Sequence, residues 1–211
     1  MLQGHLILHN RQYCHEIKCF ERRRLIDDRT MKHVENIGVG GVIVAQGEIA
    51  LRAIALGSCI GVAAYDADKR IGGMAHVMLP GSAPDKAVEK TRYAANAIEE
   101  MIRQMIERGS KPGNIEVCLV GGGNVLERED DTICESIIES VREILENKGI
   151  GVKASAIGGA QRRSVSIDLE SGQVWYTEGD REKRLLWTWS ETSQYQSQCR
   201  REAEGLRNGR K

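Results

Sequence analysis

Two apolar runs joined by a polar turn constrain the fold of this chain more than any other feature of its sequence. The runs are residues 60–65 (IGVAAY) and 71–79 (IGGMAHVML), and the turn is residues 66–69 (DADK). Short apolar runs bounded by turn residues are typical of buried strands, and two in succession predict a β-hairpin. The middle of the chain is therefore expected to hold two adjacent antiparallel strands.

Cys59 and His76 lie at the open end of this hairpin. A turn centred between Ala67 and Asp68 would make them directly opposed across the ladder, with Cβ atoms about 4.5–5.5 Å apart. A thiol and an imidazole at that distance can exchange a proton, and a thiolate is a strong nucleophile. The hairpin thus predicts a cysteine-hydrolase dyad.

Packing offers an alternative explanation for the same cysteine. Free cysteines are among the most buried residues, so a cysteine beside an apolar strand is more often a small core residue. Gly57 and Ser58 precede Cys59 and supply small, flexible backbone where an oxyanion would need N–H donors. From spacing alone, the catalytic and the structural interpretation both stay open.

The segments around the hairpin alternate between strand and helix patterns, which predicts an α+β domain with mixed β-sheets. Strands are expected at residues 37–45, 49–55, 115–120, 150–157, 165–169 and 173–177. Helices are expected at 85–108, ending at Gly109, and at 132–148, beginning with a capping box of Thr132 and Glu135. Cys118 and Cys134 fall in these elements and are expected to be core thiols.

Composition separates three zones. Residues 1–36 read as a polar extension, 37–180 as the folded domain and 181–211 as a charged tail, with disorder expected beyond Ser190. Within the tail, residues 185–189 (LLWTW) could dock as a short strand or helix. Cys14 and Cys19 have histidines nearby, but their spacing is not a common zinc pattern, so no metal site is predicted.

Charge and cysteine content narrow the class of protein. Thirty basic and thirty acidic residues cancel, so net charge does not indicate a nucleic acid or an anionic membrane as partner. The six cysteines are irregularly spaced, which does not indicate a disulfide framework. No apolar run approaches the roughly 18 residues that span a bilayer. We therefore expect a cytoplasmic protein with reduced thiols and no membrane insertion.

Three motifs carry a family resemblance. Residues 56–62 (LGSCIGV) with 72–80 (GGMAHVMLP) form the first, 121–126 (GGGNVL) the second, and 158–159 (GG) with 163–165 (RSV) the third. Together they resemble the signature of CheD, the chemoreceptor glutamine deamidase family of bacterial and archaeal chemotaxis. The resemblance covers roughly residues 37 to 179 and is specific because of its length.

The resemblance implies a cysteine hydrolase that converts receptor glutamines to glutamates without a cofactor. Cys59 would be the nucleophile and His76 its base, with the imidazolium lowering the pKa of the thiol. It also implies β-sheets in a sandwich flanked by helices, similar to the catalytic domain of deamidating bacterial toxins. Residues assigned to the oxyanion site are Gly57 and Ser58, and those assigned to the active-site wall are Gly122, Gly123, Asn124, Arg163 and Ser164.

Two positions depart from the family pattern. The family's dyad is completed by a threonine six positions before the cysteine, where this chain has Ala53, and Ile157 stands where threonine is usual. The His76 ring would then depend on a backbone carbonyl, a water or another residue to fix its tautomer. A second interpretation follows, a binding module that docks to a receptor or to the chemotaxis phosphatase CheC. A hydrolase acting on some other amide is a third.

Overall fold

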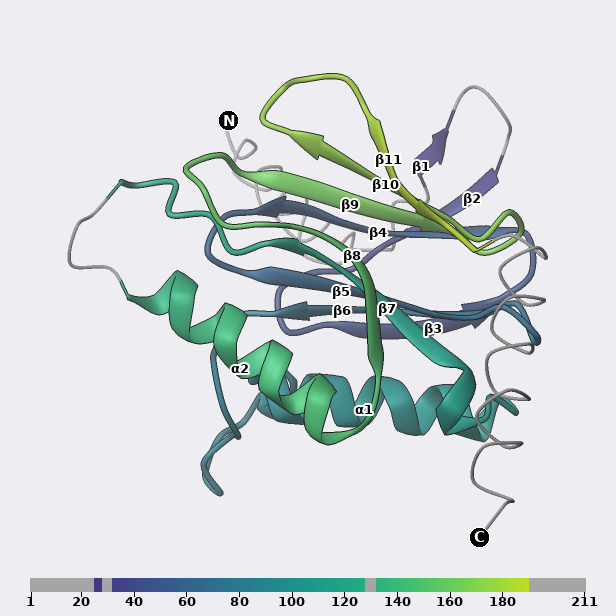
Figure 1. The fold of residues 1–211 in the computed structure, drawn as a ribbon, viewed down its shortest axis with the longest axis horizontal. Helices are drawn as coiled ribbons and strands as arrows, with labels where there is room; N and C mark the ends of the chain where they lie inside the picture. Colours follow the sequence, from purple (N-terminus) through teal and green to yellow (C-terminus); the bar gives the residue numbers. More distant parts are fainter. Residues whose placement is uncertain (1–24, 28–31, 128–131, 190–211) are drawn as a thin grey trace, which may run out of the picture.

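Two β-sheets stack face to face, and two helices cover the outer face of one of them (Figure 1). The computed structural model describes residues 25–27, 32–127 and 132–189. Parallel and antiparallel pairs occur in both sheets, since β2 pairs parallel with β4 and β7 with β8. The predicted α+β class, with mixed sheets in a sandwich beside helices, is confirmed.

The first sheet has the strand order β1-β2-β4-β9-β10-β11 and the second β3-β6-β5-β7-β8. The strands of the first sheet are β1 (Leu25–Asp27), β2 (Lys32–Asn36), β4 (Ile49–Leu56), β9 (Arg163–Asp168), β10 (Gln173–Glu178) and β11 (Arg184–Thr188). Those of the second are β3 (Val42–Gln46), β5 (Ile60–Asp66), β6 (Ile71–Val77), β7 (Ile115–Gly121) and β8 (Gly151–Ile157). The helices are α1 (Ala94–Glu107) and α2 (Ile133–Asn147), with short 3₁₀ turns η1 (Lys90–Arg92) and η2 (Pro112–Asn114).

Strands β5 and β6 of the second sheet are buried on both faces. Every residue of β5 and of β6 is buried, because the first sheet packs on one side and the helices on the other. This position explains why both strands are continuous apolar runs rather than alternating ones. By contrast, β9 alternates: Val165 and Ile167 enter the core between the sheets, while Ser164 is partly exposed.

The hairpin register differs from the predicted one by two residues. His76 pairs with Gly61 and Ile60 with Val77, so Cys59 is not directly opposite His76. Asp66 is the last strand residue rather than the first turn residue, because its Oδ1 accepts the amides of the next turn, at 3.0 and 3.2 Å. The four-residue turn that follows ends at Arg70, which adopts a positive φ of 52°. The predicted direct opposition is therefore wrong.

The first helix begins nine residues later than residue 85, at Ala94. The preceding segment returns to the end of the hairpin: Leu79 bridges Tyr93, and the Ala94 amide donates to the Leu79 carbonyl at 2.9 Å. Val88, which the predicted apolar stripe would bury, is 98% exposed. These backbone contacts outweigh the local helical pattern.

The predicted capping box of the second helix is absent. Thr132 precedes the helix in a helical conformation and makes no side-chain cap bond to it. Its carbonyl instead accepts the Ser136 hydroxyl at 2.9 Å. The C-terminal end of this helix lies where it was expected, since Lys148 is the C-cap residue and Gly149 follows with a φ of 67°.

Strands also occur on both sides of the predicted domain boundaries. β2 falls within the predicted extension and β11 within the predicted tail. Residues 185–188 lie in β11, and Trp189 directly after it donates its indole N–H to Glu116 at 2.8 Å and is 5% exposed. Cys14, Cys19 and the tail beyond residue 189 lie outside the described residues. No helix in the described part of the chain is long and apolar enough to cross a membrane.

Candidate active site

A β-bulge directs the chain toward Cys59. The register between β4 and β9 shifts between Ala53 and Leu56, and Ala55 within the bulge has a positive φ of 56°. The Ala55 amide donates to the Ser164 hydroxyl at 3.3 Å. A bulge bends its strand and re-aims the residues that follow. Residues 57–59 consequently cross from the first sheet to the start of β5 in the second.

The second glycine-rich motif holds this crossing in place through its backbone. The Gly122 amide donates to the Cys59 carbonyl and the Gly123 amide to the Gly57 carbonyl, both at 2.8 Å. A Cβ atom on Gly121, whose φ is 117°, would lie 2.2 Å from the Cys59 carbonyl oxygen. Only glycine allows this close approach. Gly122 and Gly123 therefore support the Cys59 loop, as expected for residues beside the site.

The Cys59 thiol is accessible, unlike the two core thiols. Cys59 is partly exposed, whereas Cys118 and Cys134 are 0% and 4% exposed. Burial raises the pKa of Cys59, its own backbone N–H opposes this more weakly, and Cys134 nearby adds to the rise. The expected core location of Cys118 and Cys134 is confirmed.

Backbone donors for an oxyanion are present at the same loop. The Cys59 amide lies close enough to its own sulfur to favour the thiolate. Within the described residues, neither the Ser58 nor the Cys59 amide donates to another group. Both amides can therefore point to an oxygen that develops beside the sulfur. Their role toward a substrate stays a prediction, as does that of Gly57.

His76 is held by the loop that precedes β3. Its Nδ1 lies 3.4 Å from the carbonyl oxygen of Ile37. Its backbone carbonyl accepts the Gly40 amide at 2.9 Å, and its amide donates to Gly41 at 3.0 Å. A carbonyl can only accept, so the hydrogen belongs on Nδ1 and the lone pair on Nε2. The loop thus fixes both the position of the strand and the tautomer of the ring.

The other ring nitrogen of His76 has no partner. The residue is 3% exposed, and its Nε2 is buried without a hydrogen bond among the described residues. Buried polar atoms are usually paired, so an orphaned one is a candidate for function. Burial lowers the pKa of His76, and the bond to Ile37 offsets this only in part. Burial therefore favours the neutral ring, with a free acceptor at Nε2.

Cys59 and His76 are not directly opposed. The ladder partner of His76 is Gly61, and Cys59 lies in the bend just before β5, which begins at Ile60. Diagonal positions on one face of an antiparallel pair are about 7–8 Å apart at Cα, and a register change of two residues keeps the same face of a strand. That the two side chains belong to one site stays a prediction. The thiol does not bond to Nε2 here, and such contacts often tighten only with substrate.

The pKa directions do not favour the expected ion pair. An imidazolium beside the sulfur would lower the pKa of the thiol, but burial raises the pKa of Cys59 and lowers that of His76. Both shifts favour the uncharged forms, a thiol and a neutral imidazole.

Alkylation of Cys59 is expected to report this neutral pair. The rate with iodoacetamide should rise with pH around a midpoint above the roughly 8.5 of a free cysteine, because burial disfavours the thiolate. His76→Gln should leave that midpoint nearly unchanged. Peptide mapping of the modified residue gives the rate for Cys59 alone. A plateau near neutral pH that disappears in His76→Gln would instead indicate an ion pair.

The remaining predicted wall residues brace loops near the site. Arg163, with a 9% exposed side chain, donates to the Gly158 carbonyl and pairs with Glu178 at 2.8 Å. The backbone N–H of Asn124 donates to the Gly159 carbonyl at 2.8 Å. Ser164 accepts the bulge amide described above. These contacts position the backbone around Cys59, while contact of these side chains with a substrate stays a prediction.

Ile37 is the contact of His76 that the sequence patterns missed. Ala53 is 0% exposed in the core between the sheets, and Ile37 lies on the adjacent strand line, its amide donating to the Arg52 carbonyl at 2.8 Å. Of the three groups proposed to orient His76, a backbone carbonyl is the one present. Every residue has a carbonyl, so no side-chain signal could identify this one.

Metal binding finds no support in the described residues, where no three histidine, cysteine, aspartate or glutamate side chains gather into a possible site. The expectation of a reaction without a metal or cofactor rests on the family resemblance alone.

Comparison with known proteins agrees with the motifs. The family model described as "CheD chemotactic sensory transduction" matches residues 78–178. A "Probable chemoreceptor glutamine deamidase CheD" from Chlorobium luteolum is 40% identical over 132 residues, which span 62% of this chain and 66% of the relative. A protein of the same name from Methanococcus maripaludis is 30% identical over 154 residues, which span 72% of this chain and 99% of the relative.

A "Chemoreceptor glutamine deamidase CheD" from Thermotoga maritima is 31% identical over 138 residues, which span 65% of this chain and 87% of the relative. Among solved structures, Bacillus licheniformis hypothetical protein YfiH aligns with a TM-score of 0.35 and 16% identity, covering 64% of this chain and 62% of that chain. That likeness is too low to bear on fold or function. The relatives and the family model confirm the resemblance, and the chain belongs to the CheD family.

Proposed function

We propose that this chain is a chemoreceptor glutamine deamidase, which hydrolyses the side-chain amide of receptor glutamines to glutamate and releases ammonia. The names of its relatives support this assignment. The observation that carries it is the orphaned Nε2 of a buried His76 on β6, the strand paired with β5, which begins directly after the partly exposed Cys59. The substrate would be the cytoplasmic part of the receptor, so the protein would act in the cytoplasm.

Acylation would proceed from the neutral pair. Nε2 of His76 takes the thiol proton as the sulfur of Cys59 attacks the amide carbon of the glutamine. The Ser58 and Cys59 amides would donate to the oxyanion of the tetrahedral intermediate. His76 then returns the proton to the leaving nitrogen, and ammonia departs. The product of this half-reaction is a thioester between Cys59 and the glutamyl side chain.

Deacylation would use the same groups in reverse. A water gives one proton to Nε2 of His76 while its oxygen attacks the thioester carbon. Collapse of the intermediate breaks the carbon–sulfur bond, and His76 returns the proton to the sulfur. The glutamate side chain leaves, and thiol and neutral imidazole are restored. Because burial lowers the pKa of His76, this base is available at neutral pH.

The Ile37 carbonyl takes the orienting role in place of the family threonine. Ala53→Thr is therefore expected to change the deamidation rate by less than about threefold. It should lower the free energy of unfolding by about 1–3 kcal/mol, because position 53 is fully buried and overpacking is costly. Initial rates and chemical denaturation measure the two effects. A rise in rate of tenfold or more would mean that Ile37 does not suffice.

Docking without catalysis is the second candidate function. The absence of a bond from the thiol to Nε2 among the described residues and the raised pKa of Cys59 favour it. A chemoreceptor or a CheC-type chemotaxis phosphatase would then be a binding partner rather than a substrate.

Mass spectrometry of a chemoreceptor cytoplasmic fragment separates the two candidates. The fragment is incubated with the wild-type protein and with His76→Gln, and its glutamine-containing peptides are followed in time. Conversion of specific glutamines to glutamate by the wild type, strongly slowed in His76→Gln, supports the deamidase. Binding of the fragment without any conversion would favour docking.

A further inference from the structure

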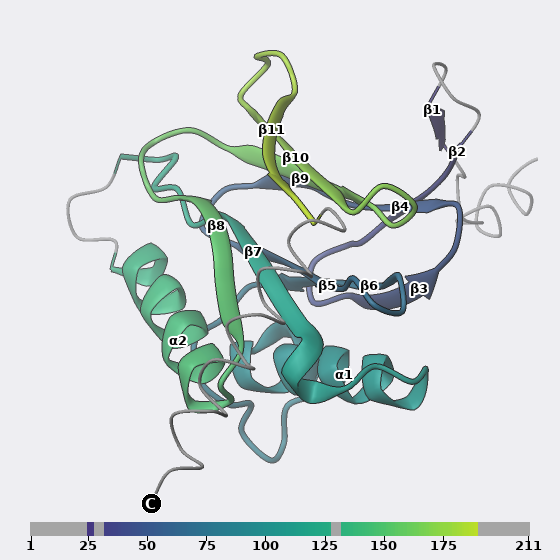
Figure 2. The same ribbon diagram turned by 45° about the vertical axis from the view of Figure 1, so that its right-hand side comes forward.

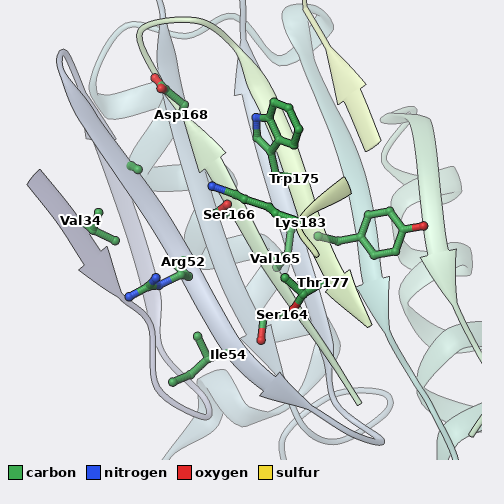
Figure 3. A pocket seen from close by; sticks show the side chains of 12 residues that line it. Val34, Arg52, Ile54, Ser164, Val165, Ser166, Asp168, Trp175, Thr177 and Lys183 are labelled. Carbon is green, nitrogen blue, oxygen red and sulfur yellow. The ribbon is translucent and has the colours of Figure 1, made fainter. Parts of the chain in front are cut away.

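A second concave site lies on the outer face of the first sheet. Its volume is about 340 Å³, and its lining includes Arg52 and Ile54 of β4, Ser164 and Ser166 of β9, Trp175 of β10 and Lys183 (Figure 3). This face is turned away from the second sheet, whereas the core fills the space between the sheets. Neither Cys59 nor His76 lines this site, although Ser164 belongs both to its lining and to the bulge contact beside the Cys59 loop.

The curvature of the sheet creates the hollow. The β10–β11 hairpin and the β1–β2 pair rise at the two ends of the sheet, and β4 and β9 lie between them (Figure 2). Ser166, on the floor, is 9% exposed although no described helix or strand covers this face. Lys183 extends from the hairpin side over this floor (Figure 3). The side chains around the floor thus form walls.

Two cations at this site lack an acidic partner. Arg52 donates its Nε to the Asn36 side-chain oxygen at 3.0 Å, and no described carboxylate pairs with its guanidinium. The Lys183 ammonium lies 5.8 Å from the centre of the Trp175 ring, again with no described carboxylate. Asp168 lies at the rim, where its Oδ1 accepts two amides of the following turn at 3.0 and 3.2 Å. The positive groups remain available to a ligand.

Apolar surface lies beside these cations. Ile54 is 52% exposed, and Trp175 is partly exposed with its ring beneath Lys183. We propose that this site docks an acidic segment of a partner protein, with carboxylates on Arg52 and Lys183 and an apolar side chain on Ile54 and Trp175. Arginine and tryptophan side chains are common anchors of protein interfaces. The proposal does not depend on the amide hydrolysis proposed above.

A polypeptide fits better than a nucleic acid. Formal net charge is zero, so the chain has no broad positive field of the kind that polyphosphates select. In an acidic polypeptide, apolar side chains separate the carboxylates. Such a segment would place its carboxylates on the two cations and its apolar side chains on the apolar surface beside them.

Fluorescence anisotropy with a labelled synthetic peptide of glutamate and leucine residues tests the proposal. The peptide should bind the full chain, and more weakly as salt is raised. A twin peptide with glutamine in place of glutamate should bind more weakly by up to about thirtyfold, because each of the two partly exposed ion pairs contributes up to about 1 kcal/mol. The double variant Arg52→Glu with Lys183→Glu should weaken binding of the acidic peptide at least as much as the change from glutamate to glutamine does.

A matched variant controls for net charge. Lys111→Glu with Lys148→Glu makes the same change in charge at exposed residues next to the helices, and should leave binding within about twofold. Arg52→Gln with Lys183→Gln gives a milder test if the glutamate variant fails to fold. Equal weakening by the two charge-reversed variants, equal binding of both peptides, or no binding to the wild type would each overturn the proposal.

Discussion

Cys59→Ala is expected to lower the rate of receptor deamidation by at least about 10⁴-fold, because it removes the atom that forms the thioester. The free energy of unfolding should change little, since Cys59 is partly exposed in a loop that backbone bonds hold. Ammonia release from the receptor fragment measures the rate, and chemical denaturation measures the stability.

Cys118→Ala is the matched control for this prediction. Cys118 is 0% exposed in β7, and burial raises its pKa to about 12, so it cannot serve as a nucleophile at neutral pH. This substitution should lower stability through the cavity that it leaves, with the rate nearly unchanged. Retention of a tenth or more of the wild-type rate by Cys59→Ala would exclude Cys59 as nucleophile.

Gly121→Ala should have the second largest effect. A Cβ atom there would lie 2.2 Å from the Cys59 carbonyl oxygen, and the φ of 117° already disfavours any other residue. The loop must move, and a displacement of about 1 Å at a reacting group can cost on the order of 10²-fold in rate. Backbone strain should also lower the free energy of unfolding by about 1–3 kcal/mol.

Gly113→Ala offers the comparison for this glycine. Gly113 lies in η2 with nothing within 4 Å of an added Cβ and without a positive φ. The Gly113→Ala variant should deamidate at the wild-type rate, and its free energy of unfolding should lie within about 0.5 kcal/mol of the wild-type value. If Gly121→Ala also deamidates at the wild-type rate, the position of the Cys59 carbonyl is not important for catalysis.

Strands such as β5 and β7 were predictable because burial on both faces leaves continuous apolar runs. β5, β7 and β4 begin and end within one residue of their expected bounds. The hairpin register was not predictable, since the position of the four-residue turn depended on Asp66, whose side chain accepts the turn amides. A shift of one residue in the turn centre moves each partner by two. The face was therefore predicted correctly and the direct opposition was not.

Helix starts failed where tertiary contacts compete with local pattern. Residues 85–93 carry helix-forming side chains, yet the bridge of Leu79 to Tyr93 requires extended backbone just before α1. Thr132 similarly had the right residue type for a cap but not the conformation. Local propensity is a weak guide at such boundaries, because one or two backbone contacts can exceed it.

For the candidate site, the sequence identified the side chains but not what supports them. Cys59 and His76 carry recognisable chemistry, and Gly121 to Gly123 were associated with them through the family resemblance. The carbonyl of Ile37 and the bulge at Ala55 are backbone features that depend on strand pairing. The pKa directions also depend on burial, which reversed the expected charge state of the pair.

Trapping the acyl-enzyme with hydroxylamine tests the central claim, a thioester at Cys59, most directly. The wild-type protein is incubated with the receptor fragment and hydroxylamine, which attacks a thioester to release the thiol and leave a hydroxamate on the former glutamine. Mass spectrometry should find hydroxamate at the glutamines that otherwise become glutamate, and none with Cys59→Ala. Glutamate formation without hydroxamate, or hydroxamate with Cys59→Ala as well, would contradict catalysis through Cys59.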